Sequence, residues 1–167
     1  MIQVYTGNGK GKTTAALGLA LRAAGAGLKV YIAQFAKGRS YCELKALKKF
    51  KNIRCAQFGR SCFIKRVPEE KDRELAQCGL EELKKIFAKK NYDLIILDEI
   101  NIALSLKLIK VKDVLGLLKM VPKKSEIVLT GRYAPPEIIK IADLVSEVKE
   151  IKHYYNKGVK ARRGIEF

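Results

Sequence analysis

Short apolar segments alternate with helical patterns along the whole chain. We expect strands over residues 2–5, 28–35, 53–58, 92–99, 125–130 and 144–152, the last of which alternates like a half-buried strand. Helices are expected over residues 13–24, 41–50, 69–90, most of 100–120, and from Pro135 to Ala142. This alternation predicts an α/β fold of three layers with a mainly parallel sheet. No repeat or linker interrupts the sequence, so we expect one domain, 1–167, with a basic tail over about 153–167.

Polar residues follow the expected strands at their carboxyl ends. In a parallel sheet these ends meet at one edge, where ligands bind. The polar groups are residues 6–13, 36–40 and 59–66, the pair Asp98 and Glu99, and the run Thr130, Gly131 and Arg132. Their convergence at one edge predicts a single ligand site there.

The segment YTGNGKGKTTAA, residues 5–16, joins the first strand to the first helix. Glycines let the backbone approach a ligand closely, and their amides at a helix N-terminus form a nest for anions. A P-loop has four residues between its first glycine and Gly-Lys-[Ser/Thr], whereas Gly7 is one residue too late for that spacing. The expected phosphate-binding residues are Gly7, Asn8, Gly9, Lys10, Gly11, Lys12, Thr13 and Thr14. The alternative is a glycine-rich turn that binds no ligand.

The segment LIILDE places Asp98 and Glu99 directly after a buried strand. A carboxylate at this position holds Mg²⁺ (or Mn²⁺), directly or through water, and Thr13 and Thr14 at the helix start offer hydroxyls to a metal. Two other roles are possible from the sequence. Glu99 could polarise a water for hydrolysis, and Asp98 could simply cap the following helix.

Net charge is +17, which favours polyanionic or acidic partners, although the lysines on helical faces also fit a solvated surface. No apolar run approaches the ~20 residues that span a membrane, and no signal peptide is recognisable at the N-terminus. The four cysteines show no Cys-x-x-Cys pair. We therefore expect a cytoplasmic protein without a zinc site or a disulfide framework.

Three segments together carry a resemblance to a known family. They are TGNGKGKTTAALGLALRAAGAGLKVYIAQFAKG, LIILDEI and LTGRYAPPEIIKIADLVSEVKEIKHYYNKGVKARRGIEF. They resemble the P-loop class of ATP:cob(I)alamin adenosyltransferases, and the closing segment is the most specific of the three. The resemblance implies a P-loop NTPase-like (RecA-like) fold. It also implies an enzyme that transfers the adenosyl group of ATP to the cobalt of a reduced corrinoid.

The resemblance also implies roles for individual residues. The short loop from Gly7 to Thr13 would bind the triphosphate in the direction opposite to P-loop hydrolases, with Lys12, Thr13 and Glu99 as the catalytic residues. Arg132 would lie near the nucleotide or the corrinoid. The family's corrinoid loop, Gly-Glu-Gly-Phe-Thr-Trp, corresponds to residues 59–64, where Phe63 is the nearest aromatic substitute and the chain has no Trp.

Partners follow from the resemblance and from the charge. The substrates would be ATP and cob(I)alamin or a corrinoid precursor, and the family often forms homodimers. The basic surface suits an acidic reductase such as flavodoxin. Two rival hypotheses are a nucleic-acid-dependent ATPase of the RecA-like kind and a non-catalytic nucleotide sensor. The sequence shows no clear basic path for nucleic acid, so we expect no nucleic-acid partner.

Overall fold

The computed structural model describes residues 1–39, 41–61 and 67–167. A six-stranded sheet forms the centre, in the order β3-β2-β4-β5-β1-β6, and every strand pairing is parallel. The strands are β1 (Ile2–Thr6), β2 (Val30–Phe35), β3 (Ile53–Phe58), β4 (Leu94–Asp98), β5 (Glu126–Thr130) and β6 (Leu144–Glu147). The expected parallel sheet is confirmed.

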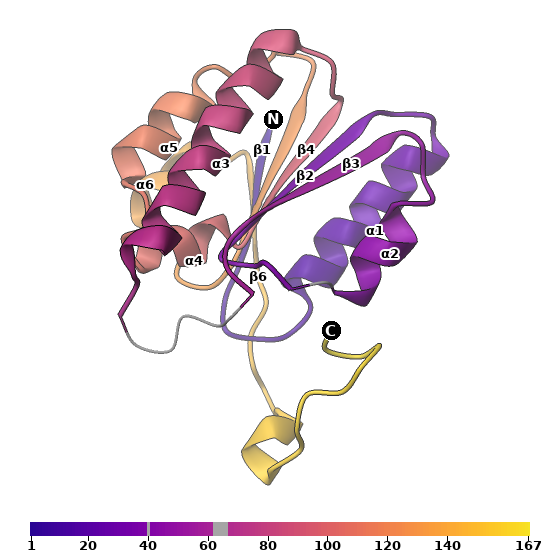
Figure 1. The fold of residues 1–167 in the computed structure, drawn as a ribbon, viewed down its shortest axis with the longest axis vertical. Helices are drawn as coiled ribbons and strands as arrows, with labels where there is room; N and C mark the ends of the chain where they lie inside the picture. Colours follow the sequence, from indigo (N-terminus) through magenta and orange to yellow (C-terminus); the bar gives the residue numbers. More distant parts are fainter. Residues whose placement is uncertain (40, 62–66) are drawn as a thin grey trace.

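Helices cover both faces of this sheet (Figure 1). The helices are α1 (Lys12–Gly25), α2 (Cys42–Leu47), α3 (Glu70–Lys89), α4 (Ile100–Ser105), α5 (Val111–Leu118) and α6 (Pro136–Ile141). One apolar cluster joins α1 and α2 to the sheet, and a larger cluster joins the other four helices to the opposite face. The predicted three-layer architecture is therefore confirmed.

Helix α3 illustrates how the sequence specifies these layers. Glu69 and Asp72 form a capping box at its start. Their side chains accept hydrogen bonds from backbone amides that have no partner within the helix. Buried residues then recur at helical spacing, with Ala76, Leu80 and Leu83 on the face that meets the sheet. In β2, by contrast, all six residues are buried, as expected for a strand covered on both faces.

The strand register brings the polar residues together at the carboxyl ends. Gln34 of β2 lies opposite Asp98 of β4 and also opposite Gln57 of β3. Strand β5 lies between β1 and β4, and its Thr130 is opposite Tyr5. As a result, the ends of β1, β2, β4 and β5 surround one site.

Residues 100–120 are mostly helical, as expected, and form two short helices, α4 and α5. Two details differ from the sequence-based expectations. The last strand ends at Glu147, not at residue 152, and all four of its residues are exposed because β6 is an edge strand. The tail contains a 3₁₀ turn, Tyr154–Lys157, with the single His153 accepting a hydrogen bond from the amide of Tyr155.

Of the helices in the described residues, none has the length and hydropathy that a membrane crossing requires.

Candidate functional site

The glycine-rich loop connects β1 to α1. Gly11 has a left-handed backbone, with φ 115°, and α1 begins at the next residue. Lys12 turns back into the loop, where its Nζ donates to the carbonyl oxygen of Gly9 at 2.6 Å. Its side chain is nearly buried, and this burial lowers the pKa of Lys12. The loop thus holds a desolvated ammonium at the N-terminus of a helix, a strong position for binding an anion.

The segment after β6 packs directly on this loop. The amide of Gly9 donates to the carbonyl of Val148 at 2.7 Å, and the amide of Val148 donates to the carbonyl of Thr6 at 2.8 Å. A Cβ atom at Gly7 would lie 2.5 Å from the Val148 oxygen, and one at Gly9 would lie 2.7 Å from the Lys149 oxygen. These two glycines therefore permit close backbone packing, a role that the sequence analysis did not foresee.

Asp98 is the centre of a buried hydrogen-bond network. Its Oδ1 accepts from the hydroxyls of Thr13 at 2.8 Å and Thr130 at 2.7 Å. Its Oδ2 accepts from Gln34 at 3.1 Å and from Lys37 at 2.8 Å. Burial alone would raise the pKa of Asp98, but Lys37 and the other donors hold this pKa below its usual value. The carboxylate is therefore ionised and fixes the Thr13 hydroxyl at the start of α1.

Glu99 begins α4 with a left-handed backbone, φ 58°. Its amide donates to the hydroxyl of Thr130 at 3.0 Å, and the same hydroxyl donates to Asp98, so the backbone of Glu99 is tied to the network around Asp98. Burial raises the pKa of Glu99, and the ammonium of Lys37 opposes this rise. Gly131 comes close to this side chain, since an added Cβ atom would lie 3.2 Å from Glu99 Oε2.

Lys37 is a site residue that the sequence analysis did not single out. Its Nζ lies 2.8 Å from Asp98 Oδ2, 3.3 Å from Thr13 Oγ1 and 3.9 Å from Glu99 Oε1. Its position just after an apolar strand, in the polar loop 36–40, was the feature of the sequence that could have indicated a role in the site. Gln34 was missed because it lies within an otherwise apolar strand.

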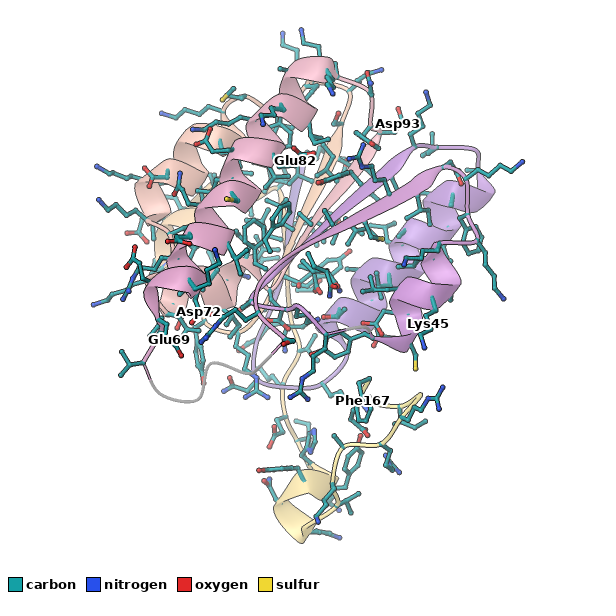
Figure 2. The ribbon with its side chains drawn as sticks, in the orientation of Figure 1. Lys45, Glu69, Asp72, Glu82, Asp93 and Phe167 are labelled. Carbon is teal, nitrogen blue, oxygen red and sulfur yellow. The ribbon has the colours of Figure 1, made fainter. Side chains whose placement is uncertain are left out.

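The C-terminal tail returns to the glycine-rich loop (Figure 1). Lys10 Nζ donates to Tyr154 Oη and to Glu166 Oε1, both at 2.7 Å, and Tyr154 also donates to Glu166. Arg162 lies over the Tyr154 ring and pairs with Glu166. Figure 2 shows the terminal Phe167 beside the loops at this edge of the molecule. Lys10 is therefore bound to the tail, and its expected contact with triphosphate stays a prediction.

The comparison with known families decides between the possible uses of this site. A family model described as "ATP:corrinoid adenosyltransferase BtuR/CobO/CobP" matches residues 1–167. The chain belongs to this family. It is a corrinoid adenosyltransferase, an enzyme of adenosylcobalamin biosynthesis whose substrates are ATP and a corrinoid. The family membership confirms the resemblance and removes the rival hypotheses of a nucleic-acid-dependent ATPase and a nucleotide sensor.

Curated relatives match over the full chain. The corrinoid adenosyltransferase of Pseudomonas aeruginosa is 32% identical over 185 residues, covering 100% of this chain and 83% of the relative. That of Sinorhizobium sp. is 35% identical over 171 residues, covering 100% and 80%. That of Escherichia coli K12 is 32% identical over 167 residues, covering 100% and 85%.

The loops after β2 and β3 pack tightly in this adenosyltransferase. A side chain on Gly38 would collide with the backbone of Gly59 and Arg60, so the two loops touch through glycine. Arg60 is held by Glu69 and Asp72 at the start of α3, which Figure 2 labels. A small pocket opens between the two loops. The expected corrinoid residue Phe63 lies outside the described residues.

The remaining expected residues are exposed to solvent. Asn8 and Thr14 are exposed, at the loop and the first turn of α1. Arg132 is also exposed; its positive charge adds to the burial that lowers the pKa of Lys12, and it opposes the burial that raises the pKa of Glu99. The structure therefore brings Lys12, Thr13, Asp98 and Glu99 together, whereas Lys10 is bound to the tail.

The donor set fits a divalent metal. One hydroxyl and two carboxylates come together from Thr13, Asp98 and Glu99, and the ammonium of Lys37 already lies among their oxygens. No group of three or more His, Cys, Asp or Glu side chains suited to a metal occurs within the described residues. A site with few protein oxygens suits Mg²⁺, which keeps several waters and binds substrate phosphates.

Proposed function

We propose that the enzyme transfers the 5′-deoxyadenosyl group of ATP to the Co(I) of a reduced corrinoid and releases inorganic triphosphate. Cobalt donates an electron pair to C5′, a Co–C bond forms, and the C5′–O bond breaks. The electron pair of that bond leaves with the triphosphate, and the cobalt is formally oxidised from Co(I) to Co(III). The observation that supports this proposal is the buried ammonium of Lys12 inside a shortened P-loop, in a chain that matches the adenosyltransferase family throughout.

The protein's part in this reaction is to bind and orient a leaving group of high negative charge. Lys12 and the N-terminus of α1 present positive charge that is already in place, so little reorganisation is needed as the bond breaks. Thr13 and Glu99, with Asp98 orienting the Thr13 hydroxyl, would hold Mg²⁺. When bound, the metal would neutralise phosphate charge.

No general base is required, since Co(I) is itself a strong nucleophile. The single histidine, His153, is not needed as a base, and its ring accepts a hydrogen bond from the Tyr155 amide within the tail. Alignment of cobalt with C5′ would come from the loops after β2 and β3, and such alignment contributes up to about 10 kcal/mol. Phe63 as a corrinoid contact, the homodimer and the flavodoxin partner stay predictions.

The released phosphate tests the proposal. With ATP, Mg²⁺ and chemically reduced cobalamin, we expect phosphorus NMR to show one inorganic triphosphate for each light-sensitive Co–C bond formed. The loop is one residue shorter than a P-loop between Gly7 and Gly11, which favours a reversed triphosphate with C5′ facing the corrinoid. Orthophosphate and ADP appearing without any corrinoid would contradict the proposal, because they would mark conventional hydrolysis.

Glu99→Ala tests the metal site separately. We expect turnover to fall about 100-fold at ordinary Mg²⁺, since removing one oxygen ligand weakens metal binding, and to recover partly as Mg²⁺ is raised. Glu137→Ala, on exposed α6, is the matched control and should keep full activity. Unchanged Mg²⁺ dependence in Glu99→Ala would remove this residue from the metal shell.

A further inference from the structure

Lys37 contacts every group of the expected metal site. Its ammonium reaches the oxygens of Thr13 and Asp98 within hydrogen-bond distance and lies 3.9 Å from Glu99 Oε1. The lysine side chain is only 15% exposed, so the pairing occurs largely out of water. A flexible surface lysine would not be held in this way, since its ammonium would gain more from hydration.

We propose that Lys37 is a built-in cation that occupies the metal position until the metal and ATP bind, and then moves to the incoming phosphates. The inference rests on the proposed function, because it takes Thr13, Asp98 and Glu99 as the metal site. Mg²⁺ binds oxygen at about 2.0–2.1 Å, so a metal on these oxygens would lie close to an ammonium held at 2.8 Å from Asp98 Oδ2 and 3.3 Å from Thr13 Oγ1. Two cations this close repel each other, so metal binding favours departure of the Lys37 ammonium.

The charges around the site explain why such a cation is present. Asp98 and Glu99 are neighbouring carboxylates at the end of a buried strand; Asp98 is fully buried and Glu99 is half-buried. Two negative charges in such a place would be costly without a counter-charge. The nearest other cations face elsewhere: Lys12 binds the carbonyl of Gly9, and Arg132 is exposed. Lys37 is the cation that directly pairs with Asp98 among the described contacts.

The displaced ammonium has a destination close by. Lys37 already donates to the Thr13 hydroxyl, which stands at the start of α1 beside the phosphate-binding amides. Lys37 belongs to a loop whose Gly38 packs closely on Gly59. This packing fixes the backbone of Lys37, while its side chain is able to rotate. The Tyr41 ring, 5.5 Å from the ammonium, lines the other side. The phosphates of bound ATP would thus replace the carboxylates as partners of Lys37.

The test measures metal binding without nucleotide. Mn²⁺ binding is followed by electron paramagnetic resonance in the wild type, in Lys37→Met and in Lys37→Arg. Methionine has similar length and no charge, so Lys37→Met should bind Mn²⁺ at least about tenfold more tightly than the wild type, because no ammonium competes. Lys37→Arg keeps the competing charge and should bind no more tightly than the wild type.

Lys29→Met is the matched control, since Lys29 is exposed at the opposite end of β2 and its loss changes the net charge equally. It should bind Mn²⁺ like the wild type. If Lys37→Met is unstable without metal, the rise of its melting temperature on adding Mn²⁺ should exceed that of the wild type. Equal Mn²⁺ affinity, or an equal thermal shift, in Lys37→Met and wild type would overturn the inference.

The failure of this inference and that of the proposed function give different results. If wild-type protein forms triphosphate and the Co–C bond with Mn²⁺ and ATP, but Lys37→Met binds Mn²⁺ no more tightly, only the role of Lys37 is wrong. If no protein binds Mn²⁺ even with ATP and no triphosphate forms, the proposed function fails and the role of Lys37 fails with it.

Discussion

Lys12→Met is expected to lower kcat/KM by about 10²–10³-fold while leaving the melting temperature unchanged or slightly higher. Lys12 is 7% exposed, and its ammonium binds only the Gly9 carbonyl among the described hydrogen bonds. Burial lowers the pKa of Lys12, which shows that the charged form is held there at a cost to folding. The fold therefore gains little from this charge, and a bound triphosphate would gain much.

Steady-state adenosylation and a thermal melt of each protein measure the two effects. Lys29→Met, exposed at the amino end of the sheet, removes the same charge far from the loop and should be active. ATP affinity should also fall in Lys12→Met, because the phosphates lose a desolvated partner. A large drop in melting temperature together with unchanged ATP affinity would instead assign Lys12 a structural role.

The layers of the fold could be predicted because they depend on a pattern that each segment carries by itself. Strands such as β2 and β4 are apolar except for Gln34 and Asp98 near their ends, and helices such as α3 repeat buried residues at helical spacing. The position of the site followed from the rule that parallel strands present their carboxyl ends at one edge. The exposure of β6 could not be predicted, because an edge position depends on the order of the strands in the sheet.

The candidate site was predictable only where one short segment carries the signal. Lys12, Thr13, Asp98 and Glu99 lie in two such segments, and the structure brings them together. Lys37 and Gln34 reach Asp98 from another strand and its loop, so their roles depend on register. No local pattern marks a lysine or a glutamine for this contact.

The contacts of the C-terminal tail could not be predicted either, because they join residues that are far apart in the sequence. Lys10 belongs to the glycine-rich loop by sequence, yet its partners Tyr154 and Glu166 are more than 140 positions later in the chain. This pair is exposed to solvent, so water and salt screen it, and phosphate can replace Glu166 as the partner of Lys10. Gly7 and Gly9 differ from Lys10, since they pack against the backbone of Val148 and Lys149, which cannot easily move.

Gly7→Ala is therefore expected to cause the largest structural loss of any single methyl addition in the loop. Gly7 has φ 95°, which costs an alanine about 1–3 kcal/mol, and its Cβ atom would lie 2.5 Å from the Val148 oxygen and 2.9 Å from the Val148 nitrogen. Relieving this contact would strain the hydrogen bonds that Val148 makes with Thr6 and Gly9. We expect the melting temperature to fall by about 5–10 °C and kcat/KM to fall at least 100-fold.

Gly18→Ala is the matched control within α1, where an added Cβ atom has no neighbour within 4 Å. Alanine is favoured over glycine in a helix by about 1 kcal/mol, so this variant should melt about 2–4 °C higher and keep full activity. Thermal melts and adenosylation rates of both variants separate the two roles of glycine. If Gly7→Ala melts like the wild type and keeps its activity, the 147–149 segment must move aside freely, and the C-terminal segment does not shape the phosphate loop.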